Sequence, residues 1–299
     1  MRRVALLGVA IVLVIAGVGV VTDLITAARA ERDLSRSLAT AAGIEFPPEV
    51  TLSGFPFLSH ARSGTFSGAT ITARGVAVTG CQYTKNHCFA ELGATLGEFS
   101  VADGFSIGPT DTINTASVRA YSLLNSVNLG RYLGILDLGV NTPATPDRVG
   151  GGGPQFGNLE RRSGVVLTGT VTVPPTTVLA TDSLPVPANS PASKQYPGPT
   201  VRVSVTVDLS VRDGRLHLQA TDFYTGPEEH ADASAISGSG DLNGVSKSIL
   251  RQQILQRFTT TLPRLPMPWG LIADDAHSAG SDIMVTATDG RRMLRPDEF

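Results

Sequence analysis

The sequence predicts an α+β fold in which a long, curved antiparallel sheet wraps around one amphipathic helix. Two segments, 66–78 and 200–211, alternate apolar and polar residues, which is the pattern of strands with one buried face. A third segment, 245–262, carries apolar residues at helical spacing. A strand with one apolar face needs a covering layer, and the helix is the element in the chain that suits this role.

The stretch 50–79 is the element around which we expect the sheet to form. It opens with a short extended run, and the apolar knot Gly54-Phe55-Pro56-Phe57-Leu58 follows. After a polar break, alternation begins at Phe66 and continues to Val78. A one-residue slip at Arg74-Gly75 predicts a β-bulge that bends this strand.

The second alternating strand continues into a hairpin and then, further along the chain, into the helix. Asp213-Gly214 predicts a tight turn after residues 200–211, and 215–224 form the returning strand. The helix over 245–262 ends before a proline-rich exit that begins at Pro263. A final hairpin is expected from residues 281–288 and 291–294.

Glycine and proline dominate residues 141–163 and 181–199, which predicts loops or linkers there. The segment 164–173 between them alternates like a strand. We therefore predict a loop-rich insertion at about 141–199 within one domain, 31–299.

Composition narrows the class of function. The chain has 299 residues, 17% of them charged, and a net charge of −2, so it lacks the basic field that nucleic-acid binding requires. We therefore expect no nucleic-acid partner. Abundant glycine, and many valines and threonines, favour sheet over a helical bundle.

Residues 1–30 predict an export signal. Arg2 and Arg3 precede the uncharged run Val4–Val21, which is long for a signal peptide and just long enough to span a bilayer. Ala28-Arg29-Ala30 is an end that a signal peptidase could cut. A cleaved signal peptide and a retained anchor both stay open, and both place residues 31–299 outside the cytoplasm, at the membrane or in the periplasmic space.

The two cysteines agree with export. Cys81 and Cys88 flank a short polar loop, and in an oxidising compartment they are expected to form a disulfide. Metal binding by these cysteines with His87 is the weaker alternative, because no fourth ligand lies near in the sequence.

The knot and the strand after it resemble the LmeA-like proteins of actinobacterial cell envelopes, which are lipid-binding proteins linked to the mannan chain length of lipoglycans. The resemblance rests on the knot 54–58, on Gly64-Thr65-Phe66 and on Gly75-Val76. The order of the predicted elements extends it over about 45–125 and 200–295.

The resemblance implies a tubular-lipid-binding-like fold with an apolar slot for acyl chains. The expected partner is a phospholipid or glycolipid, such as an inositol lipid or its mannosides, with envelope glycosyltransferases as candidate protein partners and no cofactor or metal. The residues expected to line the slot are Phe55, Phe57, Phe66, Ile71, Val203, Val205, Val207, Leu250, Ile254, Phe258 and Trp269. Two alternatives stay open: these residues pack on one another as a solid core, or the aromatic residues of the knot and Trp269 contact a membrane interface.

Two other classes of function are weighed against lipid binding. Gly104-Phe105-Ser106-Ile107-Gly108 matches the nucleophile elbow of serine hydrolases, but that motif needs a strand before the serine and a helix straight after it. The residues after Gly108 do not read as a helix, so we expect no enzyme. A membrane-anchored adaptor with a solid core is the other alternative.

Overall fold

The computed structural model describes residues 2–80, 88–142, 160–172, 200–224 and 247–299. Its helices are α1 (Arg2–Leu38), α2 (Phe57–Ser63), α3 (Ser126–Leu133) and α5 (Lys247–Arg257), with the short 3-10 turns η1 (Pro268–Gly270) and η2 (Pro296–Glu298). Its strands are β1 (Glu49–Ser53), β2 (Thr65–Phe66), β3 (Gly68–Val78), β4 (Cys88–Leu96), β5 (Phe99–Ser100), β6 (Ile113–Thr115), β7 (Val118–Asn125), β8 (Gly139–Asn141), β9 (Glu160–Arg161), β10 (Val165–Thr172), β11 (Thr200–Arg212), β12 (Arg215–Phe223), β13 (Thr260–Thr261), β14 (Asp275–Ala279), β15 (Asp282–Asp289) and β16 (Arg292–Leu294).

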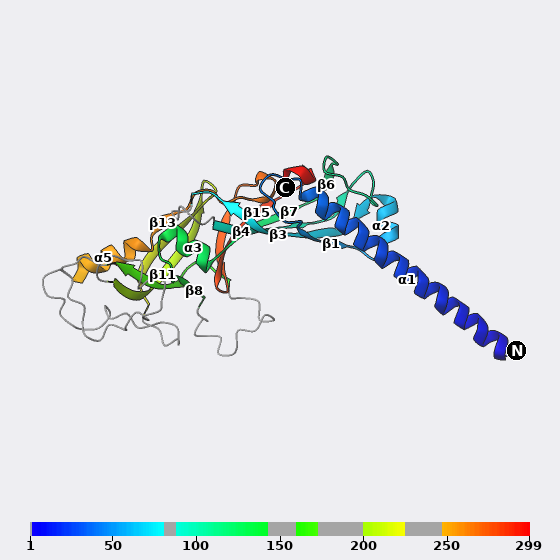
Figure 1. Ribbon diagram of the computed structural model, residues 1–299, viewed down its shortest axis with the longest axis horizontal. Helices are drawn as coiled ribbons and strands as arrows, with labels where there is room; N and C mark the ends of the chain where they lie inside the picture. The colour runs from blue at the N-terminus through cyan, green and yellow to red at the C-terminus, as the bar shows by residue number, and fades with distance from the viewer. Residues whose placement is uncertain (1, 81–87, 143–159, 173–199, 225–246) are drawn as a thin grey trace.

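The α+β class and the antiparallel sheets are confirmed, and the described strands divide among three open sheets. The largest has the order β1-β3-β4-β7-β15-β14-β9, the second β13-β12-β11-β10-β8, and the smallest β16-β6-β5-β2. The molecule is elongated, with the second sheet, α3 and α5 toward one end and α1 projecting from the other (Figure 1).

The first sheet begins as the alternating sequence predicts. β1 pairs with β3 in antiparallel register, and β3 pairs with β4. The register of β3 against β4 shifts between Ala73 and Val76, where Gly75 has a φ of +73°. This confirms the predicted bulge, because a positive φ at the slip favours glycine.

The second sheet contains the predicted hairpin. β11 pairs with β12 around Asp213 and Gly214, whose φ angles of 52° and 70° are those of a tight hairpin turn. β10 lies between β11 and β8, so the strand predicted at 164–173 is confirmed as an inner strand of this sheet. The rest of the predicted insertion lies mostly outside the described residues, and its division from the domain stays a prediction.

Two features differ from the sequence prediction. The helix predicted over 245–262 ends earlier, at Arg257, because residues 260–261 form β13 and pair with β12. α3 begins after Asn125, whose side chain accepts a hydrogen bond from the backbone N–H of Asn128 (2.9 Å) and so caps the helix. The predicted final hairpin is wrong: β15 pairs with β14 and β7, whereas β16 pairs with β6 in the smallest sheet. Alternation identified these strands but carries no information about their partners.

Buried side chains form two apolar clusters. The first cluster, the proximal core, contains side chains from the C-terminal half of α1, from α2 and from the outer half of the first sheet. Leu34, Phe66 and Ile71 are among its members. The distal core packs α3 and α5 on the second sheet around Val205, Ile254 and neighbouring residues. The partly buried Met267 packs against both clusters, so the segment after α5 lies at the junction of the two cores.

Stability is expected to fall at high pH because of Tyr132 on α3. Its hydroxyl donates to the backbone oxygen of Thr79 (2.6 Å), and burial raises the pKa of Tyr132 to about 12. In the unfolded chain tyrosine ionises near pH 10, so the stabilisation is complete below about pH 10 and is lost as the pH rises toward 12. Urea unfolding from pH 8 to 12 should show this decline, and Tyr132→Phe should flatten it; an equally steep decline in the variant would contradict the assignment.

Candidate pocket at the junction of the two cores

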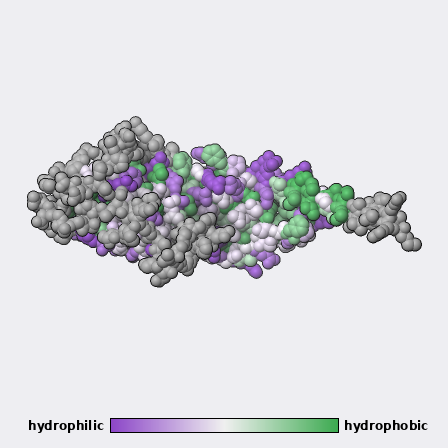
Figure 2. Space-filling model, turned by 90° about the horizontal axis from the view of Figure 1, so that it is seen from below, coloured by the Kyte–Doolittle hydropathy of each residue, from purple (hydrophilic) through white to green (hydrophobic). Residues whose placement is uncertain are grey.

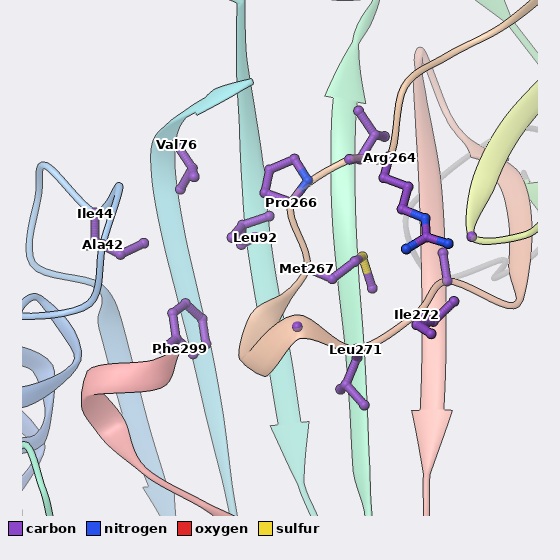
Figure 3. A pocket seen from close by; sticks show the side chains of 14 residues that line it. Ala42, Ile44, Val76, Leu92, Arg264, Pro266, Met267, Leu271, Ile272 and Phe299 are labelled. Atoms are coloured by element: carbon purple, nitrogen blue, oxygen red, sulfur yellow. The ribbon is translucent and has the colours of Figure 1, made fainter. Parts of the chain in front are cut away.

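A pocket of about 340 Å³ opens where the proximal and distal cores meet. The loop after α1, strands β3 and β4, the β11–β12 turn, the segment after α5 and the C-terminal residue all contribute to its wall (Figure 3). Its volume lies within the range of about 300–1,000 Å³ that is usual for small-molecule sites. The lining residues are Ala42, Ile44, Val76, Leu92, Gly214, Arg264, Leu265, Pro266, Met267, Gly270, Leu271, Ile272, Ala273 and Phe299.

The segment 263–273 supplies more than half of this lining. α5 has already ended at Arg257 and β13 follows it, and the prolines from Pro263 onward keep the chain in extended and turn conformations where it crosses the first sheet. Trp269 fixes the crossing: its indole N–H donates to the backbone oxygen of Arg295 (2.9 Å), and its ring packs edge-on against Phe299 at 5.0 Å. The backbone of Trp269 itself is left-handed, with a φ of 51°.

The side chains of the wall are apolar except at one cation, and exposed backbone groups supply further polar surface. Arg264 is the single charged side chain among the 14 residues that line the pocket, and it is exposed to solvent. Its Nε donates to the backbone oxygen of Asp213 (3.1 Å), which holds the guanidinium beside the β11–β12 turn and Ile272 (Figure 3). The remaining N–H groups of a guanidinium suit a phosphate or carboxylate. Chemically, the pocket fits a molecule with an apolar tail and an anionic head.

The residues predicted to line a slot are separated by the structure. Phe57, Phe66, Ile71 and Trp269 belong to the proximal core, whereas Val203, Val205, Val207, Leu250, Ile254 and Phe258 belong to the distal core. All ten are buried, with 6% exposure or less, and none is among the residues that line the pocket. Phe55 alone is exposed, at 69%. Their contact with lipid stays a prediction, and for the distal set it would require α5 to move away from the sheet.

The pocket residues were missed at the sequence level. Ala42, Ile44 and Phe299 lie far from the segment 263–273 in the chain and have no pattern in common. The one local signal was the run of prolines after the helix, which indicates a chain crossing in extended form. A wall built from segments far apart in the sequence gives no periodicity to detect.

The cysteines and candidate metal ligands are only partly described. Cys88 is buried at the start of β4 and is disulfide-bonded, whereas Cys81, its predicted partner, and His87 lie outside the described residues. In the described part of the chain, no three His, Cys, Asp or Glu side chains are placed to hold a metal ion.

The segment 104–108 does not have the geometry of a nucleophile elbow. It lies in the loop between β5 and β6, with no helix after Ser106, which is exposed. Its glycines have packing roles instead. A Cβ at Gly104 would lie 2.5 Å from the backbone oxygen of Ala61 and 2.7 Å from its Cα, and the N–H of Gly108 donates to Asp111 Oδ2 (2.7 Å).

A substitution at Gly104 should therefore lower the stability of the protein, whereas one at Ser106 should leave it nearly unchanged. Gly104→Ala is expected to destabilise the protein by about 1–3 kcal/mol, because the backbone of α2 cannot yield to the added methyl group. Ser106→Ala should change the unfolding free energy by less than about 0.5 kcal/mol, as exposed substitutions do. Urea unfolding of both variants tests this. An activity probe that labels the wild type but not Ser106→Ala would contradict the conclusion that Ser106 is not a nucleophile.

Fold and pocket together suit a binding protein for an amphiphile, in which a cavity between two cores is lined by apolar side chains and one cation. The comparison with known families agrees. The chain belongs to the LmeA-like phospholipid-binding family, whose family model matches residues 21–288. No curated protein and no solved structure matches the chain. Phospholipid binding is thus the function that the family supports.

Proposed function

We propose that this protein is an extracytoplasmic phospholipid-binding protein that holds inositol lipids or their mannosides during the assembly of cell-envelope lipoglycans. The observation that carries the proposal is the pocket, because its apolar side chains suit an acyl chain and Arg264 suits the phosphate of the headgroup. The family supports lipid binding rather than catalysis. Envelope glycosyltransferases that extend mannan chains are the protein partners that this role requires.

The N-terminal helix is compatible with export, which the same role requires. α1 contains a segment, Leu13–Leu38, that is long and apolar enough to cross a membrane, and the apolar 18-residue window within it has a mean hydropathy of 1.7. Such a helix at the N-terminus suits a signal peptide or an anchor, and in both cases the pocket would lie outside the cytoplasm. Lipoglycan assembly outside the membrane needs a protein that shields acyl chains from water.

The energetics favour an acyl chain as the guest of the apolar wall. Each methylene moved from water into such a wall contributes about 0.8 kcal/mol, so even six to eight methylenes contribute roughly 5–6 kcal/mol before the entropic cost of binding. The Arg264–phosphate pair is exposed and adds only about 1 kcal/mol. The acyl tail therefore supplies most of the affinity for the lipid, and Arg264 selects an anionic headgroup.

Lipid extraction of the full-length protein, purified from membranes and analysed by mass spectrometry, tests the proposal. We expect phospholipid at a ratio near one per protein, enriched in inositol lipids over their share of the membrane extract. Protein that is free of lipid after purification and takes up none from liposomes containing phosphatidylinositol would overturn it.

Removing the cation should weaken selection of the head without abolishing binding. Arg264→Gln is expected to lower affinity for anionic phospholipids by about 1 kcal/mol, or roughly fivefold, because one exposed ion pair is lost. Affinity for a neutral phospholipid should change little. Titration with fluorescent lipids measures both, and Arg257→Gln, on the exposed side of α5, is the matched control. Equal losses in the two variants would contradict a direct contact.

A further inference from the structure

Two carboxylates of α1 hold the apolar knot and the strand before it. Asp23 is buried, at 4% exposure, and accepts hydrogen bonds from the backbone N–H of Phe57 (2.8 Å) and of Leu58 (2.7 Å). It thereby satisfies the first N–H groups of α2, which the N-cap residue Pro56 cannot do. Glu31 accepts from the backbone N–H of Leu52 (2.9 Å).

These contacts set the direction in which the knot runs. Glu31 and Asp23 are eight positions apart on α1, or about 12 Å along its axis. The chain from Leu52 to Phe57 therefore follows α1 toward its N-terminus, and α2 lies beside α1 at the end of the body nearest the N-terminus (Figure 1). The residues just before Phe57 thus lie near the level of Asp23.

On the N-terminal side of Asp23, the described part of α1 is apolar and exposed. Large apolar side chains from Leu13 to Ile25 are 45–67% exposed and form a continuous apolar surface (Figure 2). The hydroxyls of Thr22 and Thr26 donate to the backbone oxygens of Val18 and Thr22 (both 2.8 Å), so these polar groups are satisfied within the helix. Between Leu13 and Ala28 the single ionisable residue is Asp23, which faces the body. Such a surface suits hydrocarbon rather than water.

Phe55 extends this apolar surface onto the body. Its side chain is 69% exposed and Pro56 is also exposed, whereas Phe57, two residues on, is 3% exposed in the proximal core. The knot therefore buries one aromatic ring and presents the other to the outside, beside the apolar length of α1. The first exposed charge after this level is that of Arg29, and Arg32 follows it.

We propose that Phe55 and Pro56, together with Val20, Val21, Leu24 and Ile25 of α1, form a membrane foot that rests in the interface of a lipid bilayer, with α1 retained as the anchor. The bilayer is the partner that fits, because the foot continues an apolar helix of membrane-spanning length and adds an exposed aromatic side chain beside it, which suits the membrane interface.

The packing of α1 explains why the helix is retained. Cleavage after Ala30 would cut a helix whose residue 30 is itself 1% exposed, and would remove Asp23 from the N-terminus of α2. The position of the foot also sets the height of the pocket above the bilayer. From Asp23 to the end of α1 at Leu38 the helix rises about 22 Å, and the pocket begins shortly afterwards, at Ala42. A lipid in the pocket would therefore be held above the bilayer rather than within it.

Depth measurements on the full chain in vesicles of phosphatidylcholine and phosphatidylglycerol test the foot. A nitrobenzoxadiazole label on Phe55→Cys is compared with one on Met293→Cys, whose native side chain is 73% exposed on β16, at the opposite edge of the smallest sheet from β2, the strand that contacts α2. We expect spin-labelled lipids to quench the label at 55 several-fold more strongly than the label at 293. Asp23→Ala should reduce that difference while the chain stays in the membrane, because the knot loses the two hydrogen bonds that hold it to α1.

Two results would overturn the inference. One is equal quenching at 55 and 293 in the anchored chain. The other is a mass of the cell-derived protein that places its first residue after Ala30. Neither result depends on the guest of the pocket, because bound phospholipid is measured separately in the same preparation and reports on the proposed function alone.

Discussion

Replacing Ala42 with tryptophan is expected to lower the phospholipid bound by this protein at least about tenfold. The indole would occupy pocket volume that acyl methylenes otherwise fill, and displacing two of them costs about 1.6 kcal/mol. Ala42 lies on the pocket wall but is itself exposed, so the larger side chain displaces guest rather than core. The unfolding free energy should therefore change by less than about 0.5 kcal/mol.

The matched control is Ala102→Trp, which adds the same side chain at an exposed alanine in the loop after β5, outside the pocket lining. Bound lipid per protein, measured by extraction and mass spectrometry, should stay at the wild-type level in the control. Wild-type lipid content in Ala42→Trp would show that the guest, if there is one, lies elsewhere, and would direct attention to the distal core around α5.

Local patterns in the sequence predicted the parts of the fold that local physics decides. The bulge at Gly75 and the turn at Gly214 were predictable because each needs a backbone conformation that favours glycine, inside a segment whose alternation is otherwise regular. Strand pairing was not predictable in the same way. β16 alternates like a strand of the final hairpin, yet its hydrogen bonds go to β6.

The same distinction explains why the site was harder to predict than the fold. Apolar residues such as Val205 and Ile254 were correctly placed on inward faces, but an inward face does not tell a slot from a packed core. The pocket forms where two cores fail to meet completely, and its one cation, Arg264, comes from a segment whose path prolines decide. Only the folded structure brings these segments together.

Phe66→Ala is expected to destabilise the protein by about 3–5 kcal/mol, as truncation of a buried phenylalanine usually does. Phe66 is 1% exposed, stacks on Phe99 with ring centroids 5.0 Å apart, and lies 5.8 Å from the ring of Phe57. It therefore joins the smallest sheet to α2 and to the base of the knot. Its ring contacts should contribute beyond simple area burial.

Urea unfolding of Phe66→Ala decides between a packed residue and the lining of a lipid slot. A packed phenylalanine loses its full burial whether or not lipid is present, so the loss of stability should be the same in lipid-loaded and delipidated protein. Phe105→Ala, at a residue that is 41% exposed, is the control and should lose less than about 1 kcal/mol. A loss that appears only in the lipid-loaded protein would instead place an acyl chain against Phe66, because the stability that the ring contributes would then come from the bound guest.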